Sequence, residues 1–147
     1  MMAASAWALY NKAKKYIGDG TIDLDTHTFK AVLCSSASNA ATLTIEDYTA
    51  ITNELSTANG YTNGGQALTS VTWVESSGTV TFDSNDITWN ASGGSITARF
   101  CVIYDDTSSP KKLICYTLLD TTPADVTATA GTPFTIQLSA SGIFRAS

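Results

Sequence analysis

The fold class is decided by residues 96–106, which read ITARFCVIYDD. Apolar residues occupy every second position of this stretch, at Ile96, Ala98, Phe100, Val102 and Tyr104. A period of two is typical of a β-strand that buries one face. The acidic pair that follows Tyr104, and the Ser-Ser-Pro run at 108–110, predict the turn that ends the strand. We therefore expect residues 96–104 to form the longest strand of a β-domain.

The segments on either side carry the same pattern. Further strands are predicted at residues 21–25, 29–34, 67–73, 79–83, 87–89, 112–119, 126–129 and 134–138. Residues 112–119 are apolar enough for a central strand, and Ser77-Gly78 predicts a hairpin turn. Many short strands separated by Gly, Asn and Ser indicate a mainly β fold, either an antiparallel β-sandwich or a jelly-roll-like barrel.

The N-terminal segment has a helical spacing instead. Ser5 can cap a helix that runs to Ile17, with Trp7 and Tyr10 on one side and Gly18 as its stop. We expect residues 1–18 to form an N-terminal helical arm and residues 19–147 to form the β-sandwich, the two making one structural domain. A helical turn capped by Thr44 is also predicted.

Composition narrows the class of protein. The chain has 147 residues, 44% of them hydrophobic and 14% charged, with a formal net charge of −5. An acidic balance argues against a general nucleic-acid binder, and no apolar stretch is long enough to span a membrane. The first 16 residues lack the pattern of a signal peptide. The chain also contains 23 Thr and 16 Ser, a composition that suits strands and turns.

The residues that could carry chemistry form no recognisable motif. Three cysteines, Cys34, Cys101 and Cys115, include no CxxC pair, which indicates buried thiols in a protein made in a reducing cytoplasm. His27 is the single histidine and lies in a predicted turn, and no GxSxG sequence is present. Carboxylates cluster at residues 19–25, 83–86 and 105–106 without the glycine and glutamate of a calcium loop. We expect turn-forming roles for them, and we predict no enzyme, no cofactor and no metal.

Candidate contact residues lie in two places. Trp7 and Tyr10 would form an aromatic anchor on the helical arm. The longest irregular stretch, residues 51–66, would form a contact loop around Asn53, Asn59, Tyr61 and Asn63. Trp73 and Trp89 occupy alternating positions that match a sandwich core, although three tryptophans in one chain could also form a sugar-binding platform.

Several strings, spread over nearly the whole chain, resemble a group of small virion structural proteins of tailed bacteriophages. They are AW (6–7), YN (10–11), GTIDLDT (20–26), TFK (28–30), ITNEL (51–55), ANGY (58–61), GG (64–65), residues 68–73, GGSITAR (93–99), CVIYDD (101–106) and ASGIF (140–144).

The resemblance implies a capsid decoration or cement protein that stabilises the head shell by non-covalent contacts. The major capsid protein or neighbouring virion proteins would be its partners, and a homo-oligomer, for which a trimer is one fitting arrangement, would be its assembled form. The alternative is a tail-associated component or a receptor- or glycan-binding fibre module. The implied location is the virion, assembled in the host cytoplasm, and no catalytic residue is transferred by the resemblance.

Overall fold

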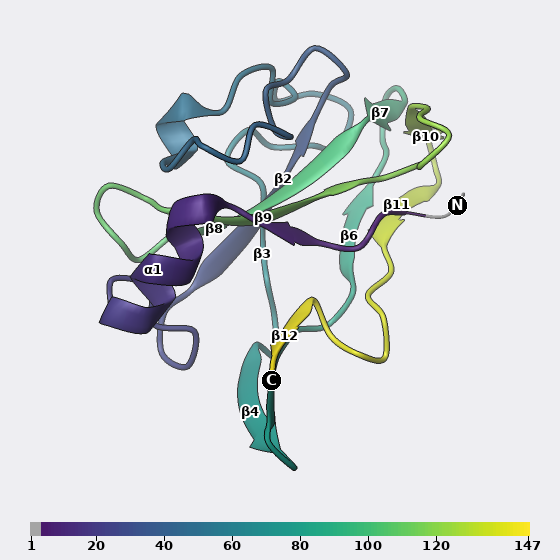
Figure 1. Cartoon of the computed structure of the whole chain (residues 1–147). Helices are drawn as coiled ribbons and strands as arrows, with labels where there is room; N and C mark the ends of the chain where they lie inside the picture. The colour runs from purple at the N-terminus through teal and green to yellow at the C-terminus, as the bar shows by residue number, and fades with distance from the viewer. Residues whose placement is uncertain (1–3) are drawn as a thin grey trace.

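The computed structural model describes residues 4–147 as one short helix and a set of antiparallel strands (Figure 1). A five-stranded sheet forms its centre, in the order β1-β9-β8-β2-β3. The strands span Ala8–Leu9 (β1), Leu113–Leu118 (β9), Phe100–Asp105 (β8), Phe29–Cys34 (β2) and Gln66–Ala67 (β3). The longest pairings join β8 to both β2 and β9, which places the predicted strand at residues 112–119 inside the sheet.

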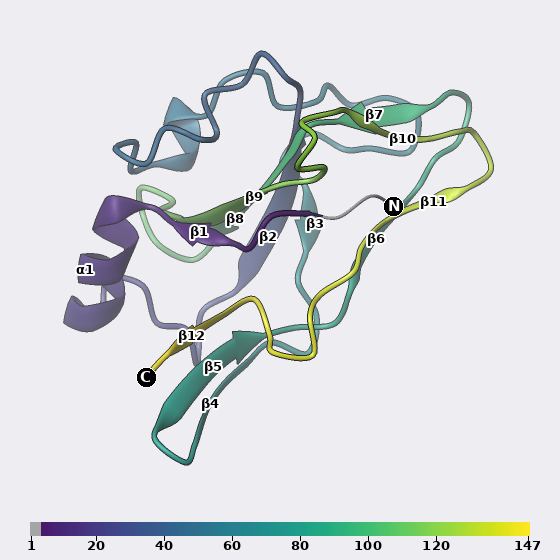
Figure 2. The ribbon, with the colours of Figure 1, turned by 45° about the vertical axis from the view of Figure 1, so that its right-hand side comes forward.

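A second layer of shorter pairs covers one face of this sheet (Figure 2). Three strands pair in the order β12-β5-β4, and two further pairs join β11 to β6 and β10 to β7. Their bounds are Thr72–Ser76 (β4), Thr79–Asp83 (β5), Ile87–Asn90 (β6), Ile96–Ala98 (β7), Val126–Ala128 (β10), Pro133–Ile136 (β11) and Phe144–Ala146 (β12). The prediction of a mainly β, sandwich-like fold with an N-terminal helix is confirmed.

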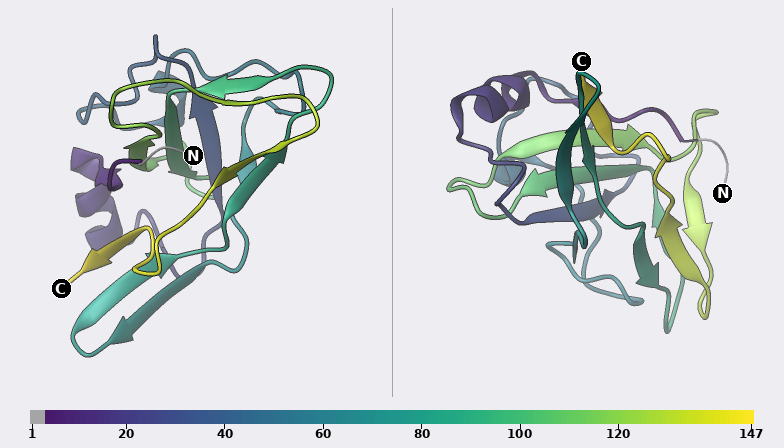
Figure 3. Two further views of the ribbon diagram at one scale, coloured as in Figure 1. Left: turned by 90° about the vertical axis from the view of Figure 1, so that its right-hand side faces the viewer. Right: turned by 90° about the horizontal axis from the view of Figure 1, so that it is seen from below.

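Helix α1 (Asn11–Asp19) and the loop after β2, which contains the short 3₁₀ helix η1 (Tyr48–Ala50), cover the other face of the central sheet. The sheet is therefore buried on both sides, which explains why β8 is apolar at consecutive positions. The main core lies between the two sheets and includes Phe82, Trp89 and Phe134. A smaller cluster lies under α1 and the loop. Figure 3 shows from two further sides how α1 lies beside the central strands.

The long strand predicted at residues 96–104 is interrupted at Arg99. Ile96 and Ala98 of β7 face the main core, but Val102 and Tyr104 of β8 face the smaller cluster. The change occurs because the backbone at Arg99 bonds to two different strands, its N–H to Cys34 O and its carbonyl to Leu119 N–H. One irregular residue reverses the parity of every side chain that follows it. The expectation of one continuous alternating face was wrong.

The N-terminal helix begins later than predicted. Ser5 caps no helix: its backbone N–H bonds to Leu118 O at 2.9 Å, and its Oγ accepts the Leu118 N–H at 2.9 Å. Trp7 is consequently outside α1, which starts at Asn11 without a side-chain cap. Pairing with β9 satisfies the backbone groups that a helix would otherwise use, so tertiary contact overrides the local helical spacing. Residues 1–3 of the predicted arm lie outside the described residues.

Two smaller expectations were also wrong. Residues 21–25 form turns rather than a strand, because the Asp23 carboxylate accepts the backbone N–H groups of Asp25 and Thr26. No helical turn begins at Thr44, and the 3₁₀ helix starts four residues later. Within residues 4–147, no helix has the length and apolar character needed to cross a membrane.

Candidate interface groove

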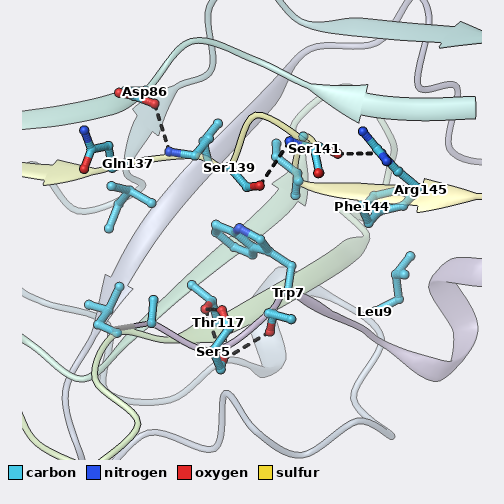
Figure 4. Close-up of a pocket in the computed structure, with 17 residues that line it drawn as sticks. Ser5, Trp7, Leu9, Asp86, Thr117, Gln137, Ser139, Ser141, Phe144 and Arg145 are labelled. Atoms are coloured by element: carbon cyan, nitrogen blue, oxygen red, sulfur yellow. Dashed lines mark hydrogen bonds between the residues drawn. The ribbon is translucent and has the colours of Figure 1, made fainter. Parts of the chain in front are cut away.

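An open groove of about 850 Å³ lies between the two ends of the chain (Figure 4). Its N-terminal wall comes from residues 4–9 and its C-terminal wall from residues 136–145, with Asp86, Thr117 and Leu119 completing the lining. The indole of Trp7 stands between the two walls, half-buried against the main core. The N-terminal wall is extended, whereas the C-terminal wall contains a turn in which the Gly142 N–H bonds to Ser139 O, and the groove between them is partly open to solvent.

The N-terminal wall is held by strand pairing and by one hydroxyl pair. Ala8 and Leu9 pair with β9, and the Tyr10 N–H bonds to Ile114 O at 3.0 Å. The Thr117 Oγ donates to Ser5 O at 2.7 Å, and this hydroxyl is buried. Trp7 is therefore fixed between two anchored residues, and its position does not depend on a helix.

The C-terminal wall is held by a series of turn contacts. The Asp86 carboxylate accepts the Leu138 N–H at 2.9 Å, and the Ile143 N–H bonds to Phe82 O at 2.8 Å. Arg145 Nε donates to Ser141 O at 2.9 Å. These bonds leave the Arg145 guanidinium and the exposed Gln137 amide along the rim. The groove thus offers an aromatic face surrounded by polar groups of both signs, an arrangement typical of protein contact sites.

The other predicted contact residues lie outside the groove, and the two tyrosines among them are buried. Tyr10 has 0% exposure, and its hydroxyl donates to Ala40 O at 2.6 Å. Tyr61 is 2% exposed and belongs to the main core. Asn59 and Asn63 are exposed, but their amides donate to Ser95 O at 3.0 Å and Leu55 O at 3.2 Å.

Asn53 also lies outside the groove. It adopts a positive φ of 55°, and its carbonyl accepts the Ser35 N–H at 3.0 Å. Of the six predicted contact residues, the structure places only Trp7 in the groove.

The loop of residues 51–65 is fastened by one carboxylate. Glu54 Oε1 accepts the Tyr61 hydroxyl at 2.8 Å and the Gly64 N–H at 2.7 Å, and Oε2 accepts the Tyr48 hydroxyl. Burial, with the Glu54 charge adding to it, raises the pKa of Tyr61 above its ordinary value, so this phenol remains a donor. Gly65 is required next to this cluster, because its φ is +87° and an added Cβ would lie 2.1 Å from Ala31 O.

The single histidine, predicted to lie in a turn, pairs with a buried carboxylate. His27 Nδ1 lies 2.6 Å from Asp105 Oδ2, and the Asp105 side chain is fully buried. Asp105 Oδ1 also accepts the Thr107 N–H at 2.9 Å, which orders the turn after β8. Cys101 lies four residues before Asp105 on β8, which is about 13 Å from Asp105 along an extended strand. The predicted turn-forming role of the carboxylates is confirmed at Asp105, as it is at Asp23.

The three thiols lie inside the central sheet. Cys34, Cys101 and Cys115 all have 0% exposure, as the sequence predicts. Burial raises the pKa of Cys34 to about 12 and raises the pKa of the other two thiols as well. The reactive thiolate is therefore scarce at neutral and mildly alkaline pH.

We expect iodoacetamide at pH 8 to leave all three thiols of the native protein unmodified over an hour. Because the pKa of each thiol is raised by burial, unfolding in urea should return it towards its ordinary value and allow all three to react. Intact-mass spectrometry before and after unfolding measures this. Labelling of a native thiol at the rate of the unfolded chain would contradict the buried arrangement.

Within residues 4–147, no three His, Cys, Asp or Glu side chains converge in a way that could hold a metal ion. Comparison with protein-family models, curated proteins and solved structures gives no match for this chain. The class that the fold defines is therefore a mainly β, sandwich-like domain with a groove between its chain ends.

The C-terminal wall of the groove was not anticipated from the sequence. Ser139, Ser141 and Gly142 indicate a loop, but nothing in their spacing connects them to Trp7, more than 130 residues earlier. An isolated tryptophan beside short polar segments was the only available signal.

Proposed function

We propose that the protein is a bacteriophage virion structural component, a capsid decoration or cement protein that stabilises the head shell by non-covalent contacts. The whole-chain resemblance described above suggests the class, and the groove around Trp7 supplies the contact. A cement protein that binds assembled shell but not free capsid subunits shifts the assembly equilibrium by mass action, without any bond being made or broken.

The observation that carries this proposal is the position of Trp7. A large aromatic side chain, half-buried at the base of a groove and flanked by rigid walls, is ready to contact a partner with little loss of entropy. The groove is partly open to solvent, and the occupant that we propose is an extended segment of the major capsid protein with one apolar side chain that packs on the indole. The polar rim fixes the direction of that segment.

The outer surface of the second layer supports the same role. Pairs of threonines hydrogen-bond across neighbouring strands, Thr88 to Thr135 at 3.1 Å and Thr97 to Thr127 at 2.8 Å. These side chains satisfy each other, and a neutral hydroxyl surface costs less to desolvate than a charged one. A virion protein that loses surface to several neighbours benefits from such a face.

A tail-associated or glycan-binding fibre module is the second candidate. The feature that favours it is the same groove, because an indole beside Asp86, Gln137 and Arg145 also has the groups that bind a sugar ring and its hydroxyls. Sedimentation with purified empty capsids, with isolated tails and with host cells separates the two functions. Binding to tails or host glycans without binding to capsids would overturn the capsid proposal.

We expect Trp7→Ala to weaken capsid binding about thirtyfold, the equivalent of about 2 kcal/mol for a contact anchor. The loss in the free energy of unfolding should be smaller than the loss in the free energy of binding, because the indole is only partly buried against the main core and the strand pairing of residues 8–9 does not depend on it. Trp7→Phe should restore most of the affinity. Lys14→Ala, on the exposed side of α1, is the control with unchanged binding. Parallel losses of affinity and stability in Trp7→Ala would contradict a contact role.

A further inference from the structure

The hairpin of β4 and β5 extends away from the body of the protein and leaves one strand edge open (Figure 2). Within the part of the chain described, β4 pairs with β5 alone, so its other edge has no strand beside it. Val74, at the middle of β4, is 57% exposed and is the most exposed large apolar side chain of the described residues. An open edge with an exposed apolar residue at its centre is a template for strand pairing.

The hairpin turn determines which backbone groups of β4 point outward. Ser77 and Gly78 have φ values of 52° and 83°, the geometry of a two-residue turn, and Ser76 pairs with Thr79 across it. Residues that flank a two-residue turn form a hydrogen-bonded pair, and such pairs alternate along the hairpin. The N–H and C=O groups of Trp73 and Glu75 therefore point away from β5, towards the open edge.

We propose that this edge pairs antiparallel with β4 of a second copy, with Val74 on the two-fold axis. In this register Thr72 lies opposite Ser76 of the other copy, and Trp73 lies opposite Glu75 of the other copy. All five residues of β4 are therefore paired. Trp73 of one copy exchanges both backbone bonds with Glu75 of the other, and the reverse pair does the same. The outward groups of the two edges match without any rearrangement of the chain.

Charge and burial favour this register over its neighbours. Moving the axis by one position to Glu75 would place two carboxylates directly opposite each other, which is destabilising. Moving it to Trp73 would take the pairing beyond Thr72, where β4 begins. With Val74 on the axis, the two valines cover each other, and each Glu75, whose Oε1 accepts the Gly78 N–H at 2.7 Å, lies opposite Trp73 of the other copy. The result is one continuous sheet in the order β12-β5-β4-β4-β5-β12.

The contact is small, because it involves five residues from each copy, and it is therefore weak between free molecules. On a shell that holds many copies at fixed spacing, the same contact is strengthened by a high effective concentration. This inference deepens the proposed role as a capsid decoration or cement protein and rests on it for its biological setting. The contact itself is isologous and produces a dimer, so it can be tested without a virion.

Cysteine cross-linking tests the register directly. In Val74→Cys, the two new thiols face each other at a non-hydrogen-bonded pair, where the Cα atoms are about 4.5 Å apart and a disulfide fits. In the matched variant Thr72→Cys, on the same face, the thiols are about 13 Å apart along the strand. We expect Val74→Cys to form a disulfide dimer at least tenfold faster than Thr72→Cys under mild oxidation. The native thiols are buried and do not interfere.

A second measurement uses charge. Val74→Lys places two ammonium groups together on the axis and should shift the concentration of half-dimerisation at least tenfold upward in sedimentation experiments. Thr79→Lys, at the tip of the same hairpin and away from the axis, should leave it unchanged.

Equal cross-linking at residues 72 and 74, or none at either position, would overturn the contact. Cross-linking as predicted in a chain that binds no shell would instead overturn the proposed function and leave the contact standing.

Discussion

We expect Phe82→Ala to lower the free energy of unfolding by about 3–5 kcal/mol, the range for deleting a fully buried phenylalanine. Phe82 has 0% exposure and occupies the central strand of the β12-β5-β4 sheet. Its ring lies 5.3 Å from Phe29, edge to face, and 5.3 Å from Phe144. Because Phe29 belongs to the central sheet, the Phe82 side chain joins the two layers.

Urea denaturation followed by tryptophan fluorescence measures this loss, since Trp73 and Trp89 both pack in or against the same core. Val74→Ala is the control on the same sheet: its exposed side chain should change stability by no more than about 0.5 kcal/mol. Phe82→Ala therefore tests how the hairpin is attached to the core, whereas Val74→Ala tests only its exposed edge. A loss below about 1 kcal/mol in Phe82→Ala would mean that the layers are not joined at this residue.

The arrangement of strands could be predicted wherever alternation was local. Residues 79–83 have a clean period of two, residues 29–34 place Phe29, Ala31 and Leu33 on one face, and the structure keeps both as strands. The break at Arg99 was missed because Cys101 and Ile103 are as apolar as Val102, so the change of parity leaves the hydrophobic pattern almost intact. A strand buried on both faces carries no signal of which face belongs to which core.

The functional site was harder to predict, because its parts meet only through tertiary structure. Trp7 was identified as a contact residue on the assumption that it lay on a helix, whereas its position depends on pairing between residues 8–9 and β9. Tyr61 was expected to face outward in the loop, but a phenol can reach inward to bond a carboxylate and a backbone amide at once. The direction of a side chain in an irregular segment depends on residues far away in the sequence, and the local sequence does not reveal which residues these are.

The hydrogen bonds that Glu54 accepts inside the loop give the second large predicted effect on stability. We expect Glu54→Ala to lower the free energy of unfolding by about 2–4 kcal/mol, because hydrogen bonds to a charged group contribute about 1.5–3 kcal/mol each and are not additive. The substitution leaves the Tyr61 hydroxyl and the Gly64 N–H without their acceptor. It also releases Tyr48, which stacks on Tyr104 at 4.2 Å. The loop of residues 51–65 should then loosen before the sheet does.

Hydrogen exchange monitored by NMR distinguishes this local effect from general destabilisation. The amides of Gly64 and Leu33, which bond to Glu54 and to the Tyr61 hydroxyl, should exchange much faster in Glu54→Ala, while that of Val102 in β8 should change only with global stability. Glu54→Gln keeps the shape and one carbonyl acceptor, and should lose about half as much stability. If all three amides accelerate equally in Glu54→Ala, the carboxylate is not the fastening of the loop. If Gly64 alone accelerates, Glu54 fixes the turn but not the contact between Tyr61 and β2.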